Sequence, residues 1–84
     1  MFVGTQFHGT LPANATQKWF TFNWPPQWYV DWSVVPTTPR PGAPEIESSV
    51  EVERASPTGV TYWITIHNLT GAPVDIEARY AVLN

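Results

Sequence analysis

The stretch VTYWITIHN, residues 60–68, decides the fold class. Every even position from 60 to 66 is apolar, whereas the odd positions carry threonine, tryptophan or histidine. Successive side chains of a β-strand point to opposite faces of the sheet, and this sequence has the same period of two. We therefore predict that residues 60–68 form a strand with one face toward a core.

Further stretches extend the pattern on both sides of this strand. Residues 45–55 alternate glutamates with apolar side chains, and the runs 17–24 and 28–35 are apolar at most even positions. Residues 2–8 add one more candidate strand, and no stretch keeps a helical period. We predict an all-β chain in which residues 1–84 form a single antiparallel domain. The simplest closure is a small β-sandwich or flattened barrel of five to six strands.

Matching the apolar faces predicts how these strands pair. A loop at Pro25-Pro26-Gln27 would join 17–24 to 28–35 in a hairpin, with Trp24 opposite Trp28 and Trp19 left on the polar face. The strands 45–55 and 60–68 need an odd-length loop or a β-bulge between them, which Gly59 would supply.

The stretch Leu69-Thr70-Gly71 predicts a further tight hairpin, with Gly71 in the left-handed conformation. This register predicts a further strand, with Ala72 opposite Asn68 and Ala78 opposite Tyr62. It sets Trp63 beside Glu77 on the polar face, with Arg79 nearby. The same turn overlaps the sequon Asn68-Leu69-Thr70, and a second sequon begins at Asn14. We interpret both asparagines as turn residues, with the Asn68 side chain bonding the turn backbone.

The composition excludes several functions. Cysteine is absent and there are only two histidines, so we expect no disulfide, no metal site and no cofactor. A net charge of −3 with four cations does not suit a phosphate backbone, and no apolar run is long enough for a transmembrane helix. We therefore expect neither a nucleic-acid partner nor membrane insertion.

The titratable side chains form no catalytic pattern. Glutamates at two-residue spacing on one strand are typical of a solvated face that resists aggregation. His67 lies on a predicted outward face and His8 in a candidate edge strand, and no nucleophile signature accompanies either. Because a chain of 84 residues has little volume for a cleft, we expect that it is not an enzyme.

Aromatic residues are the most informative feature, because five tryptophans in 84 residues exceed what a thin core needs. Several fall on predicted polar faces beside carboxylates, an amide or a guanidinium, and sugars bind to such combinations of aromatic planes and polar groups. The predicted ligand-binding residues are Trp63, Glu77, Arg79, Trp19, Tyr29, Asp31 and Asn23. The competing interpretation is that a second copy of the chain buries these aromatics.

Four segments, PTTPRPGAP, VERAS, TYWITIHNLTGAPV and IEARYAVL, resemble a short uncharacterised β-sandwich domain of exported bacterial proteins. The spacing of the last three strands is also similar to that of small oligomeric lectins of the H type. Neither resemblance identifies a site residue in this chain. The low charge and abundant tryptophan are typical of secreted or cell-surface modules, but they leave the location open.

These observations predict a non-catalytic binding module that is lectin-like and binds carbohydrate. We also expect a homo-oligomer, because so short a chain buries only a thin core and has no disulfide to supplement it. The alternative is a structural self-assembly domain that forms a homo-oligomeric ring or filament.

Overall fold

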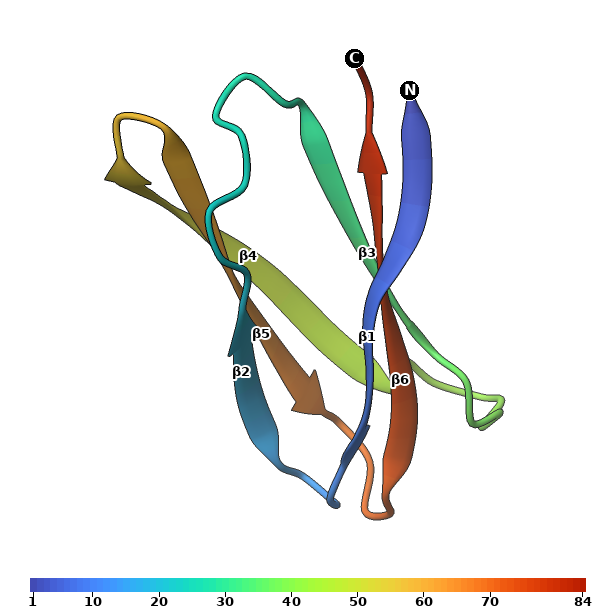
Figure 1. The fold of residues 1–84 in the computed structure, drawn as a ribbon. Coiled ribbons are helices and arrows are strands. Elements are labelled where there is room, and N and C mark those ends of the chain that lie inside the picture. The colour runs from blue at the N-terminus through green and yellow to red at the C-terminus, as the bar shows by residue number, and fades with distance from the viewer.

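The computed structural model describes all 84 residues, which form six β-strands and no helix (Figure 1). The strands are β1 (Phe2–Leu11), β2 (Thr16–Phe20), β3 (Val30–Pro36), β4 (Ile46–Ser56), β5 (Gly59–Asn68) and β6 (Val74–Val82). They form two antiparallel three-stranded sheets, in the orders β1-β6-β3 and β2-β5-β4, named here the β6 sheet and the β5 sheet. The all-β prediction is confirmed, whereas the barrel is wrong because the sheets do not close on each other. The chain has no helix of the length and apolarity that a membrane crossing requires.

Two of the three predicted hairpins are wrong, because the chain changes sheet where they were expected. The segment around Pro25–Gln27 leads from the β5 sheet to the β6 sheet, and the segment 69–73 does the same (Figure 1). Gly71 is not in the left-handed conformation, which is confined to Asn14, Asn23 and Gly42. The physical reason is that two strands facing each other across a core share an apolar face just as two hydrogen-bonded neighbours do.

The hairpin between β4 and β5 is confirmed, and of the two alternatives, an odd-length loop or a β-bulge, it contains a β-bulge. Glu53 pairs with Thr61 and Ser56 with Gly59, so two residues of β4 lie opposite the single residue Val60 of β5. The extra residue therefore belongs to β4 and is not supplied by Gly59.

The apolar face of β2 is the reverse of the predicted one. Trp19 pairs with Ile64 and points inward, where it stacks on Phe7 with ring centroids 4.8 Å apart. Phe20 therefore points outward. The irregular segment after β2, with Asn23 at a φ of 58°, shifts the alternation so that Trp24 also points inward, where it forms an isolated bridge with Val60. The prediction assumed that inward and outward side chains alternate without interruption from residue 17 to residue 24, so it missed this shift.

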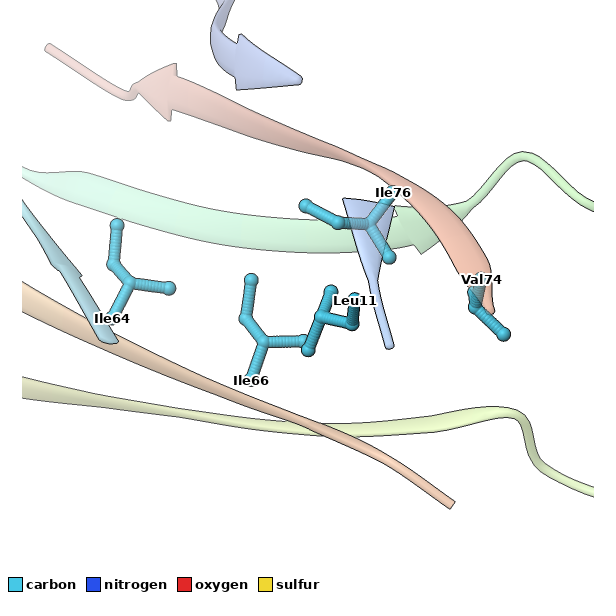
Figure 2. Packing of buried hydrophobic residues seen from close by; sticks show 5 residues of the cluster. All are labelled: Leu11, Ile64, Ile66, Val74 and Ile76. Atoms are coloured by element: carbon cyan, nitrogen blue, oxygen red, sulfur yellow. The ribbon is translucent and has the colours of Figure 1, made fainter. Parts of the chain in front are cut away.

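Five aliphatic side chains form the core between the two sheets. In Figure 2, Ile64 and Ile66 of β5 point toward Ile76 of β6, with Leu11 and Val74 beside them. All five are fully buried, but only 13 of the 84 residues are buried in total. The radius of gyration is 13.8 Å, against about 12 Å for a compact domain of this length. The core is therefore thin, as the sequence predicts.

Aromatic rings fill the space between the sheets toward the two chain termini. Trp24 lies at the centre of this cluster, 5.0 Å from Tyr80 and 5.2 Å from Trp32 between ring centroids. Gly4 permits the packing, because a Cβ atom there would lie only 2.6 Å from the Tyr80 hydroxyl. The segment that connects β2 to β3 thus supplies core side chains as well as a crossing.

Asn68 fixes the opposite end of the domain. Its buried side-chain amide donates to the carbonyls of Leu11, Pro12 and Ala72 at 2.8–3.2 Å. Its Oδ1 accepts from the backbone N–H and the hydroxyl of Thr70. The interpretation of Asn68 as a turn residue is confirmed, and burial leaves no access for a glycan. One side chain therefore joins the loop after β1 to the connection between β5 and β6.

We expect Asn68→Ala to destabilise the domain, because each buried group left unpaired costs about 1–3 kcal/mol. Urea unfolding followed by circular dichroism measures the change. Asn84→Ala is the matched control, since Asn84 also bridges two backbone groups, of Tyr29 and Gln27, but at an exposed position. An equal loss in both variants would contradict a special role for Asn68.

Alkaline pH tests the packing around Tyr62. Burial raises the pKa of its phenol above the ordinary value of about 10. The unfolded phenol ionises first, so the free energy of unfolding should fall as the pH rises above about 10 and should be unaffected by this group below that value. Tyr62→Phe should flatten this decline in urea titrations between pH 9 and 11.5. An unchanged slope would show that Tyr62 is not desolvated.

Candidate functional site

An aromatic pair lies on the outer face of the β5 sheet. The cross-strand register places Phe20 of β2, Trp63 of β5 and Glu51 of β4 in one row. The Phe20 and Trp63 rings are 5.1 Å apart between centroids with a tilt of 34°. Phe20 is 62% exposed, and Trp63 is half-buried. Two adjacent rings thus present an apolar surface to solvent in the middle of a polar face.

Charged side chains of the neighbouring strands border this pair. The Trp63 indole N–H donates to Oε1 of Glu53 at 3.0 Å, which fixes the orientation of the ring. Lys18 Nζ lies 3.5 Å from Oε1 of Glu51, and both side chains are largely exposed. An ion pair in water contributes little to stability, so these groups remain available for other partners. We name Phe20, Trp63, Glu51, Glu53 and Lys18 the aromatic platform.

Local sequence explains why the platform forms there. The alternation in β5 points Trp63 outward between two threonines, and the alternation in β4 places the glutamates on the same face. The bulge in β4 begins only after Glu53, so it does not move the side chains of Glu51 and Glu53 off the outward face. The three strands produce an open face without a deep pocket.

The structure separates Trp63 from its predicted partners. Glu77 and Arg79 lie on the outer face of the β6 sheet, on the opposite side of the molecule, where the Arg79 Nε–H donates to Glu77 at 2.6 Å. The predicted pairing of Trp63 with Glu77 is therefore wrong. It depended on the hairpin between β5 and β6, which does not form.

Arg79 does share a shallow hollow with another predicted residue, Asp31. The hollow has a volume of about 350 Å³ and is lined by Val3, Gly4, Thr5, Asp31, Trp32, Ser33, Arg79, Tyr80 and Ala81. The small side chain of Ala81 lies between Val3 and Asp31 in the register and leaves the depression. Trp32 and Tyr80 in this lining also belong to the aromatic cluster around Trp24. Both rings are partly buried, whereas the Phe20 ring of the platform is 62% exposed.

The remaining predicted residues lie apart from the platform. Trp19 points into the core, and Asn23 packs against Gly59 beside the turn between β4 and β5. Tyr29 is exposed, but its backbone bonds to Leu83 and Asn84 near the carboxyl terminus. Of the seven predicted site residues, only Trp63 belongs to the platform.

The sequence contained a signal for the missed residues. Glu51 and Glu53 could have been predicted as neighbours of Trp63, because the correctly predicted hairpin between β4 and β5 places all three side chains on the outward face. Phe20 could not be found in this way, because the predicted alternation of β2 placed its side chain in the core.

Polar side chains also pair outside the platform. His8 lies 3.7 Å from Glu77, and Thr10 donates to Asp75 at 2.6 Å, both on the outer face of the β6 sheet. No three histidine, aspartate or glutamate side chains gather in an arrangement that holds a metal ion.

A scan against protein-family models, a search of curated proteins and a search of solved structures each found no match to this chain.

Proposed function

We propose that the chain is a small non-catalytic β-sandwich module that binds carbohydrate on the aromatic platform. The observation that supports this best is Phe20, which is 62% exposed beside a tryptophan whose indole is already fixed by Glu53. A ring in water adds little to folding, whereas an oriented pair of rings offers a stacking surface with little loss of entropy on binding.

The chemistry of a sugar ring matches the platform. The apolar C–H face of a sugar packs on Phe20 and Trp63, and its hydroxyls donate to Glu51 and Glu53 or accept from Lys18. Because the surface is open and flat, it suits an extended glycan chain better than an enclosed monosaccharide. Because carboxylates outnumber the single cation, neutral glycans are favoured over anionic ones.

Phe20→Ala should weaken binding of a neutral soluble polysaccharide about tenfold or more, which corresponds to about 1.4 kcal/mol. The fold should be retained because the removed ring is exposed. Affinity electrophoresis with soluble β-glucan, α-glucan, galactomannan and polygalacturonate measures binding, and circular dichroism measures the fold.

Phe22→Ala is the matched control, because Phe22 is 82% exposed, is only two residues away and makes no aromatic contact with the platform. This variant should bind like the unmodified chain. Equal losses in both variants, or no binding of any glycan, would contradict the proposal.

The second candidate function is self-assembly, and exposed valines favour it. Val50 and Val52 are on the inward face of β4, yet they are 40% and 64% exposed, so the rest of the chain leaves them partly uncovered. With so few buried residues in the domain, a second copy that covers these side chains would add apolar burial.

If a second copy covers this face, the chain should sediment above its monomer mass of 9.4 kDa at micromolar concentration. Val52→Thr should shift the distribution toward monomer, because it replaces a methyl group by a hydroxyl without changing the β-branched shape. Val3→Thr, at an exposed position on the outer face of the β6 sheet, is the control. A monomer at all concentrations would contradict self-assembly.

A further inference from the structure

Both edges of the β5 sheet are free to pair with another chain. At one edge, every residue of β4 after Ile46 is exposed. At the other edge, β2 presents the five residues Thr16–Phe20. An unpaired strand edge carries N–H and C=O groups that accept a further strand, so the side chains along each edge decide which partner fits.

Pairing of β4 with β4 of a second copy is unfavourable. A two-fold antiparallel pair with Val50 opposite Val50 puts Glu53 opposite Glu47 of the second copy, and the symmetry repeats this contact. Like charges directly opposite each other destabilise a strand pair. The outward carboxylates therefore oppose a symmetric dimer at this edge.

Pairing of β4 with β2 of a second copy is complementary. Both strands are antiparallel to β5, so a copy displaced sideways along the sheet brings its β2 parallel to β4. Lys18 and Ser49 both pair with Thr65, so without any slide Lys18 of the second copy lies opposite Ser49. That position is between Glu47 and Glu51, the two outward carboxylates on either side of Ser49.

The inward faces match in the same register. Trp19 and Val50 both pair with Ile64, so Trp19 of the second copy lies opposite the half-exposed Val50. Gln17 of the second copy lies opposite Ser48, because both pair with Ile66. Gln17, Lys18 and Trp19 thus meet side chains of matching character, while Thr16 lies opposite Glu47 and the Phe20 ring lies opposite Glu51.

We propose that copies of this chain associate head to tail, with β2 of one copy added to β4 of the next. The inference deepens the second candidate function and does not depend on glycan binding. Neighbouring strands rotate by about 20–25°, so three strands per copy give about 60–75° between copies. A rotation combined with a displacement along the sheet does not close into a ring, so the product is an open twisted filament.

The β6 sheet does not extend in the same way. Its edge strand β1 has a register shift between Thr5 and Phe7, and its other edge strand β3 ends at Pro36, which has no N–H to donate. Each contact between copies is therefore limited to the five residues of β2. Association should be reversible and weakened by salt.

Charge exchange tests the register. Lys18→Glu makes both edges of the β5 sheet acidic, and the double variant Glu47→Lys with Glu51→Lys makes both edges basic. Each protein alone should sediment as a monomer in analytical ultracentrifugation, and an equimolar mixture should regain the size distribution of the unmodified chain. Electron microscopy of the mixture should show alternating filaments.

Arg79→Glu is the matched control, because Arg79 is also a half-exposed cation paired with a glutamate but lies on the central strand β6. It should assemble like the unmodified chain, and circular dichroism should show that every variant keeps its fold. Assembly that Lys18→Glu leaves unchanged, or that mixing does not restore, would overturn the head-to-tail register and leave self-assembly standing. An unmodified chain that stays monomeric would overturn both and leave the glycan proposal unaffected.

Discussion

The structure depends on the packing of β5 against β6 across the core. Each strand is the centre of its own sheet, so contact between their inward isoleucines sets the position of all six strands. The chain passes directly from one to the other through residues 69–73, and Asn68 holds that crossing to the end of β1. Because the two central strands use their inward faces on each other, the two outward faces remain for other partners.

This packing explains both what the sequence predicts correctly and what it does not. Alternation of apolar residues shows which side chains share a core. It located β4, β5 and β6, and it required an odd-length loop or a bulge between β4 and β5 without placing the bulge in β4. The alternation does not show whether two strands are neighbours in one sheet or face each other from two different sheets. Ile64 and Ile76 meet in either arrangement, so the alternation alone did not distinguish a hairpin from a crossing between sheets.

The same limit applies to the candidate site. Trp63 was identified because its position on β5 is independent of how β5 and β6 connect. Glu77 and Arg79 were assigned to it only through the hairpin, and the crossing moves them to the opposite face of the molecule. The reversal of β2 has a different origin, since the irregular Thr21–Asn23 segment separates two inward tryptophans of opposite parity. Left-handed asparagines are compatible with the sequence but are not specified by it.

The carboxylates of β4 connect the two proposed activities. They oppose symmetric pairing of this edge, and they border the aromatic platform that we propose as the sugar-binding surface. In a head-to-tail array, Phe20 of one copy lies beside Glu51 of the preceding copy, so the platforms follow one another along a continuous face. Three strands at a spacing of about 4.8 Å put successive platforms about 14 Å apart. If both proposals hold, an extended glycan that contacts several platforms would gain from multivalency, and weak stacking at each platform would suffice for firm attachment.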